Sequence, residues 1–309
     1  MIQHILKEAF QSQFDIVGII DAKRYLDKAK KIGKIVPPIT YPTMVVLGLT
    51  YPKRIIKHTH THLVPSFYTF GSDYHEVLKE RILKVMKNFP YAYDFGVDNH
   101  PHDERLAAVL AGVGYFGKNQ LIINKDYGTY IFLGIVFIDV EIENEIILEI
   151  NDDCGSCRQC IDACPTGALF DGGYDQEKCI GNFNQEKREL TNNEIKANYT
   201  LFGCDICQMV CPKNIDKGVI THPEFELSGK EMVSIIDLFQ DSDKEFKSKY
   251  GDMSYMWKGK TILMRNALTL ILKQKNRQYN ELIKDSIHRI GAKWYIQTAE
   301  KILENLKKE

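Results

Sequence analysis

The first half of the chain alternates short apolar runs with longer amphipathic ones. Residues 16–20 and 44–49 are continuous apolar runs, which are typical of buried strands. Between residues 74 and 89, apolar side chains recur at three- and four-residue spacing, which predicts a helix, and residues 105–113 predict a second helix. We therefore expect a mixed α/β domain in this half of the chain.

Two further patterns complete the prediction of secondary structure. Residues 121–123 and 130–140 are strand-like and flank Asp126-Tyr-Gly128, which predicts a β-hairpin. The last quarter of the chain has helical periodicity at 233–239, 261–273, 278–290 and 294–307. The last three of these helices are spaced like short antiparallel pairs, so we expect a helical segment built like one or two units of a HEAT-type repeat.

Charge and composition limit the classes of protein. The net charge is −1, but residues 244–309 hold 15 Lys+Arg and 7 Asp+Glu, so this end is basic. A basic end suggests a polyanionic partner, although a solvated helical surface gives the same pattern. The start of the chain lacks a basic and apolar leader, and the apolar stretch 130–140 is too short to span a membrane. We expect a cytoplasmic protein without a membrane anchor, in which eight cysteines are metal ligands rather than disulfides.

The cysteines form two related motifs. Cys154, Cys157, Cys160 and Cys164, followed by Pro165, have the C-x2-C-x2-C-x3-C-P spacing that binds [4Fe–4S] clusters. In this spacing three thiolates surround one cluster, and the fourth cysteine ligates the other cluster. The turn 166–168 after Pro165 can direct backbone N–H groups at sulfur.

The second motif supplies the rest of the ligands. Cys204, Cys207 and Cys211 repeat the pattern without its first cysteine, which Cys179 replaces from a distance. Cross-ligation then assigns one cluster to Cys154, Cys157, Cys160 and Cys211, and the other to Cys164, Cys179, Cys204 and Cys207. The alternative is a pair of four-cysteine zinc sites, but zinc ribbons use C-x2-C pairs rather than three successive x2 spacings. The prediction is a ferredoxin-like domain with two [4Fe–4S] clusters.

About 150 residues precede the clusters, far more than a two-cluster electron carrier needs, which implies a catalytic or cofactor-binding domain. Gly112, Gly114 and Gly117 match the letters of a dinucleotide-binding motif, but a helix precedes them and a strand follows, which is the wrong context. His58, His60 and His62 alternate in a loop. That pattern fits a metal chelate or, more simply, solvent-exposed histidines.

Longer segments resemble one known family. The segments are 70–78, Val97-Asp98, 104–119 (ERLAAVLAGVGYFGKN), the cysteine blocks with 199–212, and 257–267 (WKGKTILMRNA). They are spread through nearly the whole chain and together resemble the epoxyqueuosine reductases of tRNA maturation.

The resemblance implies a cobalamin-dependent oxidoreductase. It would reduce the epoxide of epoxyqueuosine in tRNA to queuosine, the last step of queuosine synthesis. An external low-potential donor would pass electrons through the two clusters to cobalamin. The implied architecture is α+β, with an α/β cobalamin-binding catalytic domain (1–150), the ferredoxin-like domain (151–220) and a helical tRNA-contacting segment (221–309). We expect a monomer.

The resemblance also implies site residues. Opening an epoxide releases an alkoxide that needs an acid, and the family's catalytic aspartate corresponds to Asp98. Above an apolar corrin ring we expect desolvation to raise the pKa of Asp98; a turn residue or helix cap is the ordinary alternative. The positions that correspond to cofactor contacts are Asp73, Tyr74, His75, Asp98, Lys118, Asn119, Ile122 and Leu133. Without the resemblance, Asp73, Tyr74 and His75 would be ordinary loop residues and Lys118 a surface lysine. Ile122 and Leu133 would be core residues of strands.

The basic end gains a purpose from the resemblance. Trp257, Lys258, Lys260 and Arg265 are candidates to bind the anticodon stem-loop by stacking and phosphate contacts. Helix packing for Trp257 and surface charge for the others are the alternatives.

The chain departs from the family's usual pattern at 99–103 (Asn-His-Pro-His-Asp) and at 181–184 (Gly-Asn-Phe-Asn). Two other functions therefore stay open: a corrinoid reductase of another substrate, such as a reductive dehalogenase, and a two-cluster electron-transfer protein without cobalamin.

Overall fold

The computed structural model describes residues 2–142 and 153–308, which form two compact units. Unit 1 comprises Met1–Lys53, Tyr74–Arg158 and Val210–Pro223, and unit 2 comprises Arg54–Asp73, Gln159–Met209 and Glu224–Glu309. Each unit is assembled from three stretches of chain, whereas the predicted domains are three consecutive ranges. The predicted boundary at 150/151 lies outside the described residues.

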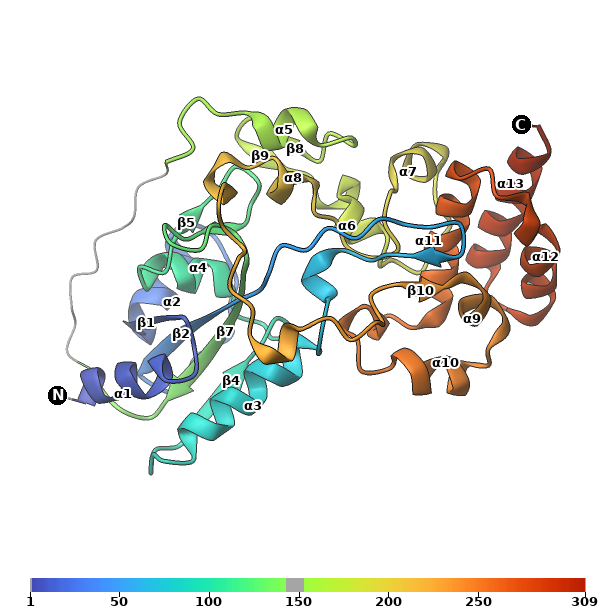
Figure 1. Ribbon diagram of the computed structural model, residues 1–309. Coiled ribbons are helices and arrows are strands. Elements are labelled where there is room, and N and C mark those ends of the chain that lie inside the picture. The colour runs from blue at the N-terminus through green and yellow to red at the C-terminus, as the bar shows by residue number, and fades with distance from the viewer. Residues whose placement is uncertain (1, 143–152, 309) are drawn as a thin grey trace. The chain divides into compact units, whose positions relative to one another are not determined.

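Unit 1 is built on one sheet with helices on both faces (Figure 1). Its elements are α1 (Ile2–Gln11), β1 (Ile16–Asp21), α2 (Ala22–Lys31), β2 (Thr43–Thr50), α3 (Tyr74–Met86), β4 (Tyr93–Gly96), α4 (Glu104–Leu110), β5 (Tyr115–Phe116), β6 (Ile122–Ile123) and β7 (Ile131–Ile138). The four-stranded sheet has the order β1-β2-β7-β4. Helices α2 and α4 pack on one face of the sheet, α1 contacts the outer strand β1, and α3 contacts the inner strand β7.

The central strand β2 shows why an uninterrupted apolar run becomes a strand here. All eight of its residues are buried, because helices cover both faces of the sheet and leave no position for a polar side chain to reach water. Close packing of α4 on β1 depends on Gly18, where an added Cβ would lie 2.6 Å from the carbonyl oxygen of Ala111.

Two features of unit 1 differ from the predictions. Every strand pair in the sheet is antiparallel, so unit 1 has an α+β arrangement, which agrees with the α+β class expected for the whole chain but not with the α/β label given to this domain. The predicted hairpin is also wrong. Strand β7 pairs with β2 and β4, while β6 pairs with β5. The eight residues of β7 find backbone partners along β2 and β4. A hairpin with β6 would offer β7 only two residues to pair with.

Unit 2 combines the cysteine-bearing loops with the C-terminal helices. Its elements are β3 (His62–Leu63), α5 (Gln159–Ala163), β8 (Leu169–Phe170), β9 (Gly173–Tyr174), α6 (Ile180–Phe183), α7 (Asn192–Ala197), α8 (Ile206–Met209), β10 (Val233–Ser234), α9 (Ile235–Gln240), α10 (Asp243–Tyr250), α11 (Lys260–Lys273), α12 (Asn280–Arg289) and α13 (Lys293–Lys308). The predicted C-terminal helices are confirmed as α9, α11, α12 and α13. One hydrophobic core joins these helices to the loops around α6 and α7.

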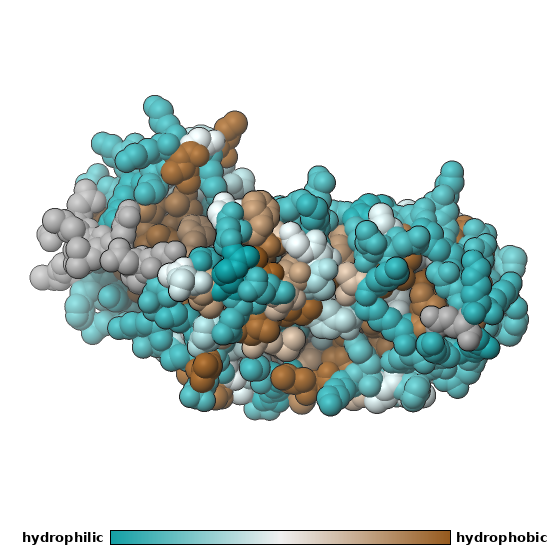
Figure 2. Space-filling view, turned by 90° about the horizontal axis from the view of Figure 1, so that it is seen from above, coloured by the Kyte–Doolittle hydropathy of each residue, from teal (hydrophilic) through white to brown (hydrophobic). Residues whose placement is uncertain are grey.

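No helix in the described ranges is long and apolar enough to cross a membrane. The face of the molecule in Figure 2 is mostly hydrophilic, with hydrophobic side chains scattered among the polar ones.

Helix α11 carries the most buried cation of unit 2. Arg265 has no exposed surface, and its guanidinium donates hydrogen bonds to the carbonyl oxygens of Phe183 (3.1 Å), Arg188 (2.8 Å) and Glu186. Burial lowers the pKa of Arg265, but the three carbonyl acceptors favour the protonated form. The guanidinium is therefore not available to a phosphate group, and Arg265 leaves the set of predicted RNA contacts.

We predict that Arg265→Met lowers the free energy of unfolding by about 3 kcal/mol, because it leaves three buried carbonyl groups without a donor. The measurement is the midpoint of denaturant unfolding followed by circular dichroism. Lys258→Met, which removes a partly exposed cation from the same region, is the control and should change the midpoint little. Equal unfolding midpoints for the two variants would contradict the conclusion that the hydrogen bonds of Arg265 to the three carbonyl groups stabilise the fold.

Candidate active site and cluster ligands

The loop after β4 holds Asp98 in a strained conformation. Asp98 has φ of 57°, in the left-handed region that non-glycine residues rarely adopt. Its backbone N–H donates to Oε1 of Glu104 at 2.9 Å, and His100 Nε2 donates to the same oxygen at 3.1 Å. Glu104 thus fixes both ends of the turn. The sequence alone did not reveal this role of Glu104, although the six-residue spacing between Asp98 and Glu104 was a signal for it.

His100 is a packing residue of this loop. Its ring covers Gly96 so closely that an added Cβ at that glycine would lie 2.1 Å from the ring. Its Nδ1 accepts from the His102 N–H at 3.3 Å, which leaves Nε2 as the donor to Glu104. The departure from the family pattern at 99–103 therefore supplies a hydrogen bond that orders the Asp98 turn.

Three predicted site residues meet at the Asp98 carboxylate. Oδ2 of Asp98 accepts from Tyr74 Oη at 3.3 Å and pairs with His75 Nε2 at 3.4 Å. The side chain of Asp98 is 56% exposed. The hydrogen bond from His75 outweighs the desolvation of the carboxyl group and lowers the pKa of Asp98. The hydrogen bond from His75 thus favours the carboxylate form of Asp98, whereas the expected rise in its pKa concerns Asp98 above a corrin ring and stays a prediction.

An aromatic stack leads to this carboxylate. The Phe132 ring stacks on Tyr51 (4.4 Å between centroids) and on Tyr74 (4.1 Å), and Tyr74 stacks on His75 at 4.0 Å. These rings come from the end of β2, from β7 and from the start of α3. They order Tyr74 and His75 beside Asp98 and present flat, polarisable surface around it.

The remaining predicted cofactor contacts of unit 1 lie on β7 and on the β5–β6 hairpin. Asn119 is buried, and its Nδ2 has no hydrogen-bond partner among the described residues. Lys118 Nζ donates to the carbonyl oxygens of Gly155 (2.6 Å) and Cys157 (3.0 Å), so it supports the first cysteine loop. Ile122 is buried in β6, and Leu133 is partly buried in β7. Asp73 belongs to unit 2, where it lines a cavity described below.

The cysteines are all free thiols, as a metal-ligand role requires. Five of them lie in unit 2, and the thiols of Cys160, Cys164, Cys179 and Cys204 are near enough to Cys207 to act on it electrostatically. Burial, followed by these neighbours, raises the pKa of Cys207 well above its ordinary value. Cys154, Cys157 and Cys211 lie in unit 1. Thiolates this close together repel one another and gain from a bound cationic iron centre, so the five cysteines of unit 2 fit a role as iron ligands.

The turn after Cys164 behaves as its sequence predicts. Burial alone would raise the pKa of Cys164, but hydrogen bonds from the Thr166 hydroxyl and from the backbone N–H groups of Leu169, Thr166 and Ala168 lower it. These donors favour the thiolate form, which is the form that binds iron.

The alternating histidines do not form a chelate. His58 is partly buried; its Nε2 lies 2.8 Å from the carbonyl oxygen of Tyr199, and its Nδ1 accepts from the Val64 N–H at 2.9 Å. His62 Nδ1 lies 2.9 Å from the Thr61 hydroxyl. Among the residues that the structure describes, no group of three or more His, Cys, Asp and Glu side chains is arranged to hold a single metal ion.

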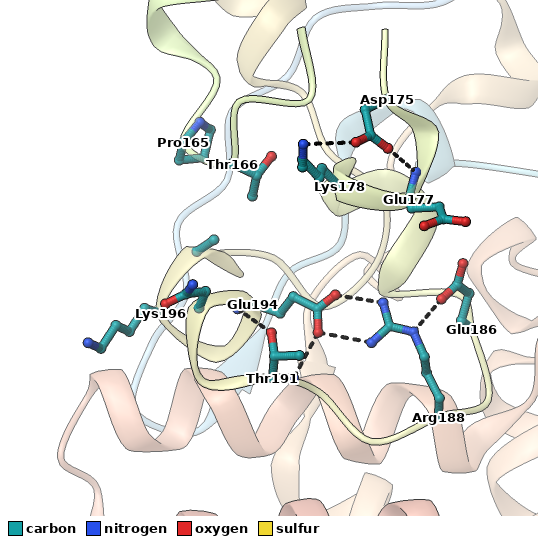
Figure 3. Close-up of a pocket in the computed structure, with 12 residues that line it drawn as sticks. Pro165, Thr166, Asp175, Glu177, Lys178, Glu186, Arg188, Thr191, Glu194 and Lys196 are labelled. Carbon is teal, nitrogen blue, oxygen red and sulfur yellow. Dashed lines mark hydrogen bonds and ion pairs between the residues drawn. The ribbon is translucent and has the colours of Figure 1, made fainter.

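Two cavities lie in unit 2. One, of about 940 Å³, opens beside Pro165 and Thr166 and is lined by charged side chains (Figure 3). Two of the three cations in its lining are paired: Arg188 bridges Glu186 (2.5 Å) and Glu194 (2.6 Å), and Lys178 pairs with Asp175 at 2.9 Å. The four acidic side chains in the lining outnumber the basic ones, so this cavity does not have the charge of a phosphate-binding site.

The second cavity, of about 470 Å³, lies between α10 and the start of α11. Its lining includes Asp73, Lys247, Trp257, Lys258 and Lys260. Trp257 is 48% exposed, and Lys258 Nζ lies 3.5 Å from the centre of its ring. Lys260 is instead buried, and its ammonium group donates to the carbonyl oxygen of Asp241. Of the predicted RNA contacts, only Trp257 and Lys258 present their side chains to solvent.

Comparison with known proteins first identifies the class of protein to which the chain belongs. Residues 153–214 match the family model described as a 4Fe-4S double cluster binding domain, which places the chain in the class of iron–sulfur proteins. The epoxyqueuosine reductase of Bacillus subtilis (strain 168) is 33% identical, and the match covers 96% of this chain and 80% of the relative. That of Bacillus anthracis is 36% identical over 73% of this chain and 62% of the relative's length. The chain belongs to the epoxyqueuosine reductase family.

Solved structures of the family share the fold. Epoxyqueuosine reductase from Streptococcus thermophilus superposes with a TM-score of 0.82 at 26% identity, covering all of this chain and 90% of that one. A second structure, of epoxyqueuosine reductase with an epoxyqueuosine-modified tRNA-Tyr stem loop, has a TM-score of 0.81 at 26% identity and covers 99% of both chains.

We predict that His75→Ala raises the pKa of Asp98 toward its ordinary value, because the variant removes the hydrogen bond that most favours the carboxylate. Carboxyl-carbon NMR of protein labelled at aspartate measures this pKa. Tyr74→Phe removes a weaker donor and should give a smaller rise in the same direction. An Asp98 titration that is the same in His75→Ala and in the parent protein would exclude His75 as the cause.

Proposed function

We propose that this protein reduces the epoxide of epoxyqueuosine in tRNA to the alkene of queuosine. One observation carries the proposal: the similarity to the structure with the epoxyqueuosine-modified stem loop extends over 99% of both chains. The hydrogen-bonded side chains of Asp98, His75 and Tyr74 agree with the proposed reaction, because opening an epoxide requires an acid next to the departing oxygen. The two other functions left open by the sequence find no comparable support.

Converting the epoxide to an alkene consumes two electrons and two protons and releases the oxygen as water. An external low-potential donor supplies the electrons through two [4Fe–4S] clusters. The chemistry that cobalamin supplies when bound is transfer of these electrons to the epoxide carbon. Asn119, whose Nδ2 has no hydrogen-bond partner among the described residues, and the aromatic stack beside Asp98 fit a flat cofactor that carries amide groups.

The protons come through the chain's own residues. Asp98 has a lowered pKa, so the carboxylate is the resting form and His75 Nε2 is the hydrogen-bond donor beside it. We infer that the pair holds one proton between Nε2 and Oδ2 and delivers it to the departing oxygen. The exposed carboxyl group is then reprotonated from solvent. The strained turn at Asp98, fixed by Glu104, keeps the carboxylate in place before substrate binds.

We expect Asp98→Asn to fold and to retain iron and cobalamin, since Asn also tolerates a positive φ, but to lose turnover by about 100-fold or more. The assay follows queuosine formation by mass spectrometry of nucleosides from tRNA that carries epoxyqueuosine, with anaerobic protein, a strong reductant and cobalamin. The matched control is Asp94→Asn, which changes an exposed aspartate of β4. Full activity of Asp98→Asn would refute the acid role, whereas no activity in the parent protein would refute the function itself.

The tRNA contact is proposed for the surface of unit 2 around the second cavity. Trp257 offers an exposed ring for base stacking, and Lys258 and Lys247 are the solvent-facing cations near it. This revises the candidate set by adding Lys247 and dropping Lys260 and Arg265. Helices α9 to α13 would then form the tRNA-contacting segment.

Reversing Lys247 and Lys258 to Glu should weaken tRNA binding by about 10-fold or more at low salt and reduce the salt dependence of the dissociation constant by about two phosphate contacts. Fluorescence anisotropy of a labelled anticodon stem-loop at several salt concentrations measures both. Lys284→Glu, at an exposed lysine of α12, controls for charge reversal elsewhere on unit 2 and makes half the change in net charge. An unchanged salt slope in the double variant would place the RNA elsewhere.

A further inference from the structure

A tyrosine hydroxyl lies against one of the proposed cluster ligands. Tyr199 Oη lies 3.5 Å from Sγ of Cys204, within hydrogen-bonding distance for sulfur. The same oxygen accepts the backbone N–H of Asp205 at 2.7 Å. A phenol has one hydrogen to donate. Since the amide occupies an acceptor site of the oxygen, the hydroxyl hydrogen is free to point at the sulfur.

Both partners of this contact are held rigidly within unit 2. His58 binds the carbonyl oxygen of Tyr199. On the other side, the Asp205 carboxylate accepts from the Ser66 hydroxyl and from the Phe67 N–H. Asn184 bonds both peptide groups of Gly203: its Nδ2 donates to the carbonyl oxygen at 2.8 Å, and its Oδ1 accepts the N–H at 3.3 Å. The distance between hydroxyl and sulfur is thus set by the fold rather than by a mobile side chain.

We propose that the Tyr199 hydroxyl raises the reduction potential of the cluster ligated by Cys204 by donating a hydrogen bond to its sulfur. The inference rests on the proposed function in one respect, the presence of a [4Fe–4S] cluster on this cysteine. One-electron reduction adds a negative charge that spreads over the cluster and its thiolates. A donor to sulfur therefore stabilises the reduced state more than the oxidised one.

The surroundings strengthen the effect. Cys204 and Tyr199 both pack against the hydrophobic core of unit 2, so their contact is partly shielded from water. In such surroundings a single hydrogen bond acts on the charge with little screening. The hydroxyl would hold this cluster above the potential that the same four thiolates would otherwise give, and so set its place in the order of electron transfer.

The test compares midpoint potentials in Tyr199→Phe and in a matched control. Tyr199→Phe removes the hydroxyl and keeps the ring. Tyr255→Phe removes a hydroxyl from a buried tyrosine of unit 2, whose hydrogen bond goes to the carbonyl oxygen of Lys230. Each holoprotein is titrated with dithionite at set potentials, and the reduced clusters are followed by electron paramagnetic resonance. We expect one of the two clusters to shift to a more negative potential in Tyr199→Phe, and neither to shift in Tyr255→Phe.

The outcomes separate the inference from the function on which it rests. Two clusters with unchanged potentials in Tyr199→Phe would overturn the tuning role and leave the enzyme assignment intact. A parent protein that binds no [4Fe–4S] cluster would overturn both. If Tyr199→Phe does not fold, His58→Ala replaces it, because that variant keeps the hydroxyl but releases the Tyr199 backbone. A negative shift of one potential in His58→Ala would support the role, and unchanged potentials would overturn it.

Discussion

Two adjacent buried side chains of α11 hold the backbone of the cysteine-rich segment. Arg265 donates to three carbonyl groups between residues 183 and 188, and Asn266 Nδ2 donates to the carbonyls of Asn184 (2.8 Å) and Leu201 (2.9 Å). A segment that must present cysteines at fixed spacing has few positions left for apolar side chains. Its loops carry many backbone groups outside regular structure, and these need partners when buried. The helix supplies those partners, so the ligand geometry depends on α11.

The same principle operates around the proposed clusters and at Asp98. The side chains of Asp205, Asn184 and His58 form hydrogen bonds with backbone groups near Cys204. The side chain of Glu104 does the same at the Asp98 turn. In each case a buried polar side chain replaces regular secondary structure as the means of ordering a loop. A site built in this way is preorganised, because its groups are already oriented before any ligand arrives.

The departures from the family's usual residues become intelligible at this level. His100 fills the space over Gly96 and completes the hydrogen bonds of Glu104, and Asn184 braces the peptide groups before Cys204. Both residues support functional side chains without lying at the centre of the proposed chemistry. They alter the support of the proposed site and leave its principal residues, Asp98 and the cysteines, as the resemblance implies them.

The sequence by itself determined what depends on local spacing. The cysteine motifs indicated the clusters, because the spacing of cysteines in a short loop sets how they can surround a metal centre. The long amphipathic helices were predicted from their periodicity. The particular residue Asp98 came only from the resemblance. Tertiary structure alone decided the partners of β7, the burial of Arg265 and the link between His58 and Tyr199, since each joins residues far apart in the chain. An arginine at position 265 reads as surface charge until the carbonyls that surround it are known. The direction of the Asp98 pKa shift likewise depended on a histidine 23 positions away.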